Sequence, residues 1–485
     1  MRTIRLLALA SISVSAIGIG AAAYVLERID RPPRELAPYL VHRAEKHRPL
    51  IVKSAAFAAG YLERMDRMAN VDFRDPTSWV GASETASRTG ASDDGLGRHY
   101  RIGSIDALVA ALNSAQPGDV IELEPGRYRI EGRGLRINRP GRPDAPITVR
   151  AERLGSVTLE SNAIEAIKIS AQNWHFENLI VRGLCDAQSD SYCEHAFHIV
   201  GAAQGTVIRN NVIIDFNAQI KINGEEGAFP DYGIVADNTL EDTRPRETAN
   251  PVTPIDLDAA SGWLIARNLI SDFVKLGGNG VSYGGFAKAA GQHNSFERNV
   301  VLCEHHLQGQ PGERVGISLG GGGSGPDIRR DKGRSELEQD NSRVSDNLIA
   351  FCSDAGIYLN RSANSQIDHN TLLDTSGIVV RFPESSARLD ENIVDGIISI
   401  RDGASASSKA NLVTSLLGLY LGLHSPRRLY SDPAHLDLTW KDTAPFGPES
   451  DSRPDLCGTK RALHAVVGAF ENFAKCLHRG ADSDR

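Results

Sequence analysis

The sequence feature that most constrains this fold is a short motif that recurs through the middle of the chain. Each copy has an Asn, then two or three branched apolar residues, then a polar residue or a turn. Successive Asn residues lie 33, 27, 30, 31, 48, 23 and 22 positions apart. Such spacing is typical of a solenoid whose coils carry insertions. The eight copies begin at Asn178, Asn211, Asn238, Asn268, Asn299, Asn347, Asn370 and Asn392.

In such a solenoid, each coil supplies short strands, and the Asn turns the corner between two of them. Stacked Asn side chains can hydrogen-bond to their equivalents in the coils above and below. The motif therefore predicts an all-β, single-stranded solenoid, a right-handed parallel β-helix. The alternative is chance recurrence among turns, where Asn is common.

Length and charge are compatible with this architecture. A chain of 485 residues is too long for one ordinary compact domain, but a solenoid has no such size limit. The net charge of −8, without a basic stripe interleaved with aromatic residues, argues against a nucleic-acid partner. We expect a monomer.

The N-terminus predicts export. Arg2 and Arg5 precede an uncharged run over residues 6–26, which at about 1.5 Å per residue would just span a bilayer core of about 30 Å. We predict a transmembrane signal anchor in the inner membrane, with the body in the periplasm. The alternative is secretion after cleavage of a signal peptide near the alanines at 21–23.

The cysteines agree with an oxidising compartment. Three local disulfides are plausible there, although six cysteines allow fifteen connectivities. No CxxC or HxxxH spacing supports a zinc site. The local pairs are Cys185 with Cys193, Cys303 with Cys352, and Cys457 with Cys476.

The remaining patterns divide the chain into four parts. Ser104 is predicted to cap a short helix that closes the N-terminal end of the solenoid. Helical spacing over 461–478 predicts a second capping helix. The parts are a signal anchor or signal peptide (1–30), a helical stalk and linker (31–97), the parallel β-helix (98–425) and a C-terminal capping segment (426–485).

Two acidic residues are candidates for cation binding. Asp256 and Asp258 stand at i and i+2 on an expected strand, so both carboxylates point to the same face. Such a pair could hold Ca²⁺ or share the acid and base roles of glycosidic hydrolysis. The alternative is two acids on a solvent-exposed face.

A glycine-rich coil supplies the candidates for catalysis. Lys, Tyr and His side chains provide a base, and cations that stabilise an enolate, for proton abstraction next to a carboxylate. The glycines allow a ligand to approach the backbone, although coil corners explain them equally well. The catalytic candidates are Lys275, Tyr283, Lys288 and His293.

Four cationic residues are candidates for binding an anionic sugar. Insertions and charges cluster in this part of the chain, which predicts a groove there. Acidic neighbours such as Asp354 and Glu384 could instead be salt-bridge partners of the arginines. The substrate-binding candidates are Lys221, Arg314, Arg361 and Arg381.

Residues 104–217 resemble the opening coils of chondroitinase B and the related alginate lyases. The resemblance is carried by Ala115-Gln-Pro-Gly-Asp-Val-Ile-Glu-Leu, Pro143-Asp-Ala-Pro-Ile-Thr-Val-Arg and Asn211-Val-Ile-Ile-Asp-Phe-Asn. It implies a β-helix of the pectin-lyase-like kind that cleaves uronic-acid polysaccharides by β-elimination. In that family, Ca²⁺ neutralises the substrate carboxylate, and Lys and Arg transfer protons.

The family's catalytic motifs are not matched. Its catalytic coils carry a Lys-Ser pair and, one coil later, an Arg-His-Gly, each shortly before a ladder Asn. The corresponding positions before Asn268 and Asn299 hold Ala259 and Ala289, and the nearest cation is Lys288. The lysine is therefore missing, and the arginine is at best displaced.

The sequence thus predicts an exported or membrane-tethered β-helix that binds an acidic polysaccharide and cleaves it by lyase-type β-elimination. One rival is a glycoside hydrolase of the polygalacturonase type, which would use the aspartates as acid and base. The other rival is a non-catalytic envelope scaffold that binds polysaccharide.

Overall fold

The computed structural model describes residues 31–69, 71–72, 76–87, 97–186, 192–448 and 453–477. The predicted signal anchor at 1–30 lies outside these ranges. Within them, no helix is long and apolar enough to cross a membrane.

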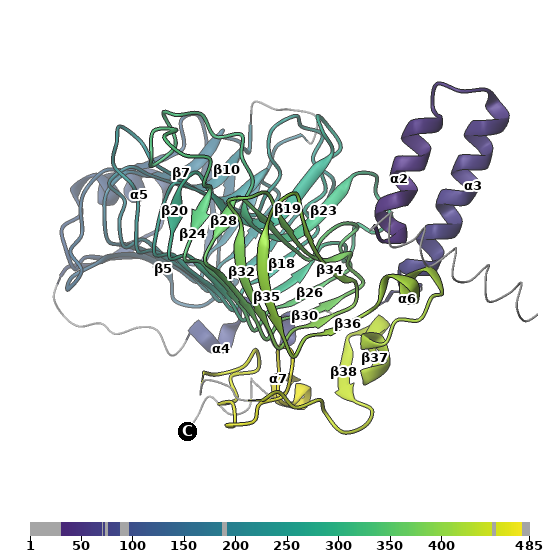
Figure 1. Cartoon of the computed structure of the whole chain (residues 1–485). Helices are drawn as coiled ribbons and strands as arrows, with labels where there is room; N and C mark the ends of the chain where they lie inside the picture. The colour runs from purple at the N-terminus through teal and green to yellow at the C-terminus, as the bar shows by residue number, and fades with distance from the viewer. Residues whose placement is uncertain are drawn as a thin grey trace, which may run out of the picture.

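The body is a right-handed parallel β-helix, as predicted (Figure 1). Most coils contribute one short strand to each of three parallel sheets. Alternate side chains point inward, so Ile255 and Leu257 are fully buried, while Asp256 and Asp258, which alternate with them, point outward. The inward residues of all coils form one continuous core.

The strands fall into the following sheets. The twelve-stranded sheet comprises β1 (His99–Ile102), β2 (Val120–Leu123), β5 (Ile147–Ala151), β8 (Trp174–Glu177), β11 (Val207–Arg209), β14 (Ile234–Ala236), β17 (Leu264–Ala266), β21 (Ser295–Glu297), β25 (Arg343–Ser345), β29 (Ser365–Asp368), β32 (Ser386–Asp390) and β35 (Ser405–Lys409). The eleven-stranded sheet comprises β3 (Gly126–Ile130), β6 (Val157–Ser161), β9 (Ile180–Gly183), β12 (Val212–Ile214), β15 (Thr239–Glu241), β18 (Leu269–Ser271), β22 (Val300–Leu302), β26 (Leu348–Ala350), β30 (Thr371–Leu373), β33 (Ile393–Val394) and β36 (Leu412–Val413). The ten-stranded sheet comprises β4 (Leu135–Ile137), β7 (Glu165–Ile169), β10 (His195–Val200), β13 (Ala218–Asn223), β16 (Ile255–Asp258), β19 (Val281–Lys288), β23 (Glu313–Gly320), β27 (Ile357–Asn360), β31 (Gly377–Arg381) and β34 (Ile397–Arg401). Two minor sheets comprise β20 (Gly291–Gln292), β24 (Gln339–Asp340) and β28 (Ser362–Ala363), and the antiparallel pair β37 (Tyr430–Asp432) and β38 (Asp437–Trp440).

The predicted Asn stack is present as a hydrogen-bonded ladder. From Asn211 to Asn392, each side-chain Nδ2 donates to the Oδ1 of the ladder Asn in the next coil, at 2.8–3.1 Å. The backbone N–H of each also donates to that same Oδ1. The ladder ends at Asn411. These buried amides are therefore satisfied from coil to coil.

The assignment of Asn178 to the ladder is wrong by one residue. Leu179 occupies the ladder position of its coil, because its backbone N–H donates to Asn211 Oδ1. Asn178 precedes the ladder and accepts a hydrogen bond from Asn210, which likewise precedes its ladder Asn. Both have a left-handed φ, a conformation that Asn adopts more readily than most residues.

Helices cover the ends of the solenoid. Ser104 caps α5 (Ile105–Ser114) as predicted, accepting a hydrogen bond from the N–H of Ala107. The helix predicted over 461–478 is wrong for the described residues 461–472, and only α7 (Phe473–Leu477) is helical; residue 478 lies outside the described ranges. The apolar residues of this segment instead follow an irregular path over the eleven-stranded sheet, where the buried Arg461 binds Asp346. Short helices near this end are α6 (Leu416–Tyr420), η2 (Pro426–Leu429) and η3 (Pro433–His435).

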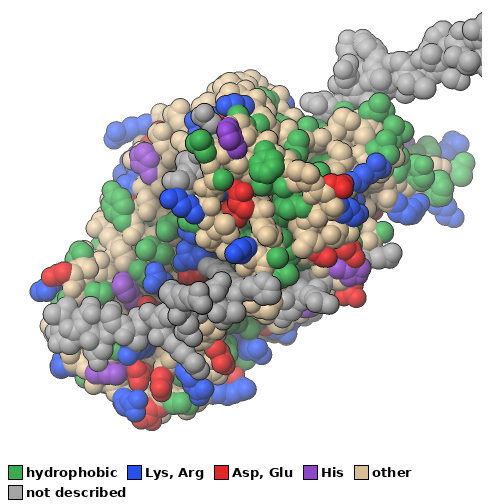
Figure 2. All heavy atoms as spheres, turned by 90° about the horizontal axis from the view of Figure 1, so that it is seen from below, with side chains coloured by type: hydrophobic (Ala, Val, Ile, Leu, Met, Phe, Trp, Pro, Cys, Tyr) green, Lys and Arg blue, Asp and Glu red, His purple; other side chains and the backbone are tan. Residues whose placement is uncertain are grey.

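The segment predicted as a stalk is a helical hairpin of α2 (Pro33–Ala44) and α3 (Pro49–Asp66), which projects from the solenoid (Figure 1). Two short elements follow it, η1 (Pro76–Ser78) and α4 (Glu84–Ser87). Seen from below, acidic and basic side chains are interspersed over the body, and the hairpin, at the right, carries hydrophobic and basic side chains (Figure 2).

The three local disulfides predicted from the sequence are all present. Their sequence separations are 8, 49 and 19 residues. The second joins two successive coils of the solenoid. The pairs are Cys185–Cys193, Cys303–Cys352 and Cys457–Cys476.

Replacing a central ladder residue tests the contribution of the ladder. Asn299→Ala would leave the Asn268 amide, the Asn347 side chain and the Ile265 carbonyl short of partners. We expect unfolding free energy to fall by about 2–4 kcal/mol, since each fully orphaned buried group costs about 1–3 kcal/mol and the Asn347 oxygen keeps the Asn299 backbone N–H as a donor. Asn411→Ala, at the half-buried last rung, is the matched control and should cost less. Equal losses in chemical denaturation would contradict this role.

Candidate functional site

The outward side chains of the ten-stranded sheet form rows that run along the helix axis. One row is set by the register of β13, β16, β19, β23 and β27. Strands lie about 4.8 Å apart, so this row is about 19 Å long. It is made of Lys221, Asp256, Phe286, Ser318 and Tyr358. A charged cluster lies at one end of the row and a pocket at the other.

The charged cluster joins three residues that the sequence had assigned to two different roles. The Lys221 ammonium lies 2.7 Å from Asp256 and 2.5 Å from Asp258. Burial opposes the lysine's charge, but the two carboxylates outweigh burial and raise its pKa above the usual range. Burial alone would raise the pKa of Asp258, but the positive charges of Lys221 and Lys288 have the larger effect and lower it.

This cluster does not fit a calcium ion. Calcium needs several oxygen ligands around one position. The Lys221 ammonium already stands between the carboxylates of Asp256 and Asp258 and donates a hydrogen bond to each. Lys288 adds a second cation 3.6 Å from Asp258, and lies 4.4 Å from the centre of the Phe286 ring. The position between the two carboxylates is therefore taken by the ammonium group and not available to calcium.

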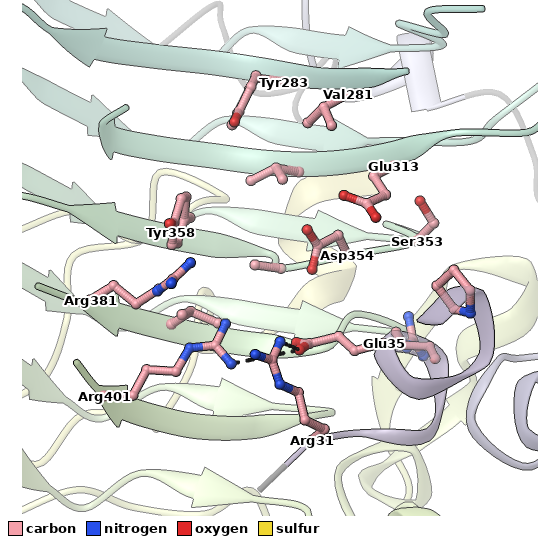
Figure 3. A pocket seen from close by; sticks show the side chains of 15 residues that line it. Arg31, Glu35, Val281, Tyr283, Glu313, Ser353, Asp354, Tyr358, Arg381 and Arg401 are labelled. Carbon is pink, nitrogen blue, oxygen red and sulfur yellow. Dashed lines mark hydrogen bonds and ion pairs between the residues drawn. The ribbon is translucent and has the colours of Figure 1, made fainter. Parts of the chain in front are cut away.

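The pocket is a cavity of about 310 Å³ between the sheet and helix α2 (Figure 3). Strands β19, β23, β27, β31 and β34 form its floor. Aromatic, acidic and basic side chains all face it. These side chains include Arg31, Glu35, Tyr283, Glu313, Asp354, Tyr358, Arg381 and Arg401.

Asp354 is the most unusual group in the pocket. It stands just before β27, among protein atoms, with part of its surface facing the cavity. Within the described ranges, no cation forms an ion pair with its carboxyl group. Burial, and then the nearby carboxylates of Glu35 and Glu313, raises the pKa of Asp354 to about 7. A carboxyl group with such a pKa can exchange protons near neutral pH.

Tyr283 and two arginines line the same cavity as this carboxyl group. Burial, and then the charges of Tyr358, Asp354 and Glu313, raises the pKa of Tyr283 to about 12, so its hydroxyl stays protonated. Arg381 binds Asp402 through Nε at 2.5 Å and packs on the Phe382 ring. Its neighbour on β34, Arg401, also faces the cavity.

The other predicted site residues lie apart from this pocket. Lys275 precedes β19 and donates to Asn279 at 3.0 Å; burial lowers its pKa. His293 follows β20, at the opposite end of the same coil. Arg314 is buried and bound to Glu304 at 2.7 Å, so its guanidinium is committed to the fold. Arg361 packs on Phe382, with the carboxyl group of Glu384 3.7 Å away.

The structure therefore brings the candidates together in two groups. Tyr283 and Arg381 line the pocket, whereas Lys221, Lys288 and the two aspartates form the cluster. Sequence reasoning missed the other pocket residues. Asp354 had no motif around it, and its neighbour Glu35 comes from a helix more than 300 residues earlier in the chain.

A separate group could hold a metal ion. Asp272, His305 and His306 offer ligand atoms that lie within 4.8 Å of one another. One Asp272 oxygen accepts the backbone N–H groups of His305, His306 and Leu307 at 2.8–2.9 Å. The aspartate therefore already has a structural role in capping this turn, and we assign no metal.

Comparison with known proteins bears on the fold. No protein-family model matches the sequence, and no curated protein matches it. Among solved structures, the pectate lyase Pel9A aligns over 82% of this chain and 100% of its own, with a TM-score of 0.53 and 15% identity. The chain has the pectin-lyase-like fold.

Two further structures with this fold are similar over about two thirds of the chain. An alginate lyase from Paenibacillus sp. str. FPU-7 aligns over 65% of this chain and 95% of its own, with 14% identity and a TM-score of 0.40. The A-module of the mannuronan C-5 epimerase AlgE4 from Azotobacter vinelandii aligns over 67% and 97%, with 11% identity and a TM-score of 0.40.

Replacing Lys221 tests the charged cluster. Lys221→Met would leave the buried Asp256 and Asp258 without their main cation, and we expect a loss of about 3–5 kcal/mol in unfolding free energy. Adding Asp256→Asn and Asp258→Asn should recover most of it. Lys168→Met removes a more exposed ion pair and should cost under about 1 kcal/mol. A small effect at Lys221 would show that the cluster is not a buried charge network.

The pH dependence of stability tests Asp354. Its raised pKa means that the stability it contributes is present below the pKa of an ordinary carboxyl group and is lost as pH rises through about 7. Asp354→Asn cannot ionise. The unfolding free energy of the variant minus that of the wild-type protein should therefore increase from about pH 4 to about pH 7, by at least about 1 kcal/mol. A difference that does not change with pH would contradict the raised pKa.

Proposed function

We propose that this protein cleaves an acidic, uronate-containing polysaccharide by β-elimination in the pocket beneath α2. The observation that carries the proposal is the pocket itself. It combines a carboxyl group whose pKa is about 7, a tyrosine that stays protonated and two arginines around one cavity. These are the groups that removal of a proton next to a carboxylate requires.

The chain's residues would divide the reaction as follows. Arg381 and Arg401 bind the uronate carboxylate and stabilise the negative charge that spreads onto it. Ionised Asp354 removes the proton from the carbon beside that carboxylate. The electron pair forms a double bond to the neighbouring carbon, whose bond to the glycosidic oxygen breaks. Tyr283 gives a proton to that oxygen, and proton exchange with solvent resets both groups.

The similar solved structures support the substrate class only by analogy, since the likeness is one of fold. The arginines that line the pocket support it more directly, because a guanidinium group is suited to binding a uronate carboxylate. Export to the periplasm, with the N-terminal run as a membrane anchor, remains part of the proposal.

Hydrolysis is the second candidate. Glu313 faces the same cavity beside Asp354 (Figure 3). Two carboxyl groups flanking a glycosidic bond are what a glycoside hydrolase uses, one as acid and one as base or nucleophile. Asp354 would then have to be protonated, so the two mechanisms predict opposite pH dependences.

An assay of purified protein with a panel of uronic-acid polymers tests the proposal. We expect ultraviolet absorbance from an unsaturated uronide, with or without added calcium, and a rate that rises as pH passes about 7. Asp354→Asn should lower the rate by about 100-fold or more. Arg381→Ala should lower it by about 100-fold.

Two exposed residues provide matched controls. Asp437→Asn, on β38, and Arg388→Ala, on β32, remove the same charges away from the pocket and should leave the rate unchanged. New reducing ends without absorbance, and a rate that falls as pH rises, would favour hydrolysis. Release of no product from any polymer would refute both mechanisms.

A further inference from the structure

We propose that the helical hairpin of α2 and α3 docks on the surface of an anionic lipid bilayer, and so holds the β-helix at a membrane. The surface that makes this contact is the outer part of the hairpin, residues 39–61. It lies outside the pocket, whose lining residues on α2 end at Pro38. The inference therefore does not depend on the chemistry proposed for that pocket.

The hairpin leaves large apolar side chains in solvent. Leu50 and Phe57 on α3 are 76% and 75% exposed, and Tyr61 is 56% exposed. At about 100° per residue, these three positions fall within about 40° of one another around the helix. Ala59 lies on the opposite side of the helix and is buried. Large apolar side chains gathered on one exposed face mark an interaction surface.

Basic side chains accompany these apolar groups. Over residues 39–61, lysines and arginines outnumber acids by four to one, whereas the whole chain has a net charge of −8. The hairpin thus differs in charge from the body that it projects from (Figure 2). All four cations are exposed. They are Arg43, Lys46, Arg48 and Lys53, and the acid is Glu45.

This combination fits a lipid surface better than other partners. Helices at a membrane interface place apolar and aromatic side chains at the acyl chains and keep Lys and Arg at anionic headgroups. A polysaccharide would use the cations and an aromatic ring, but it would leave Leu50 and Ile51 in water. A second copy of the hairpin would bring like charges face to face, which is unfavourable.

The position of the hairpin in the chain agrees with this partner. Arg31, just before α2, follows the uncharged run at 6–26 by five residues, which can span at most about 18 Å. Helix α3 has 18 residues and is therefore about 27 Å long. If the run is the membrane anchor proposed above, the hairpin starts close to the bilayer and is long enough to lie against it.

The hairpin is fixed to the solenoid, so its docking would also position the pocket. One terminal nitrogen of Arg34, on α2, donates to the carbonyls of Cys352 and Asp374, each at 2.8 Å. The other lies 2.9 Å from the carboxylate of Asp66, on α3, and 2.7 Å from that of Asp374. Both helices share this buried network. The pocket beneath α2 would therefore be held near the bilayer surface.

Tryptophan fluorescence of the full-length protein in vesicles with brominated acyl chains tests the docking, because bromine quenches tryptophan only at short range. Phe57→Trp places a tryptophan on the apolar face, and the wild-type protein, with its four tryptophans, gives the background. With one third phosphatidylglycerol in the vesicles, we expect the added tryptophan to be quenched and its emission to shift to the blue. Ile164→Trp is the matched control and should show neither change, since it is exposed beside β7, at the other end of the solenoid (Figure 1).

Removing two cations tests the electrostatic part of the contact. Lys46→Gln with Arg48→Gln, in the Phe57→Trp background, should lower the ratio of docked to undocked hairpin at least about tenfold, because each cation near an anionic surface contributes a factor of about five. High salt, or vesicles of phosphatidylcholine alone, should lower the same ratio. Arg388→Gln with Lys409→Gln removes two exposed cations of β32 and β35 and should change nothing.

The outcomes separate this inference from the proposed function. Quenching of Phe57→Trp no stronger than that of Ile164→Trp would overturn the docking, and so would quenching that ignores lipid charge. Fluorescence that responds to uronic-acid polymer or to protein concentration, and not to vesicles, would overturn it in favour of a polysaccharide or a second copy. Since no turnover is measured, docking can be upheld while the lyase is refuted, and the reverse.

Discussion

The rest of the structure depends on the hydrogen bond between the side-chain amides of ladder Asn residues in successive coils. The segments between ladder residues vary from 19 to 48 positions, yet the Nδ2–Oδ1 distance stays between 2.8 and 3.1 Å. Because that buried corner is constant, the three strands of each coil return to the same register. Insertions can then grow elsewhere without disturbing the stack. The ladder is what keeps outward side chains aligned in rows along the axis.

Those rows place chemical groups that are far apart in sequence beside one another. Lys221 and Asp256 are 35 positions apart but occupy neighbouring strands at the same register. The resulting charge network is internally satisfied, so it shapes one part of the sheet without needing a metal ion. At the other end of the row, no cation within the described ranges pairs with Asp354, and burial, followed by the carboxylates of Glu35 and Glu313, raises its pKa to about 7. Two carboxyl groups of this face thus differ in pKa: Lys221 and Lys288 lower the pKa of Asp258, whereas burial raises the pKa of Asp354.

The sequence predicted the solenoid, its N-terminal cap and its disulfides because each depends on a local pattern. The ladder was misassigned only at Asn178. This Asn has a left-handed conformation and lies one residue before the ladder position, so its sequence context matches the motif. Outward placement of Asp256 and Asp258 followed from simple alternation. The pocket could not be predicted in this way. Its wall comes from residues 31–38, whose position relative to the solenoid is fixed by contacts that no spacing encodes.

The buried Arg34 ties the beginning of the described chain to its last coils. Its contacts with Cys352 and Asp374 span 318 and 340 positions, and they exist only after the coils that carry those residues have formed. Contacts of such length close late, because the loop entropy must be overcome first. The solenoid can fold coil by coil, but α2 can pack against it only when nearly all coils have formed. A partly synthesised or truncated chain would therefore have the sheet but not the pocket. The site would form only in the last step of folding, and the unfinished protein would be inactive.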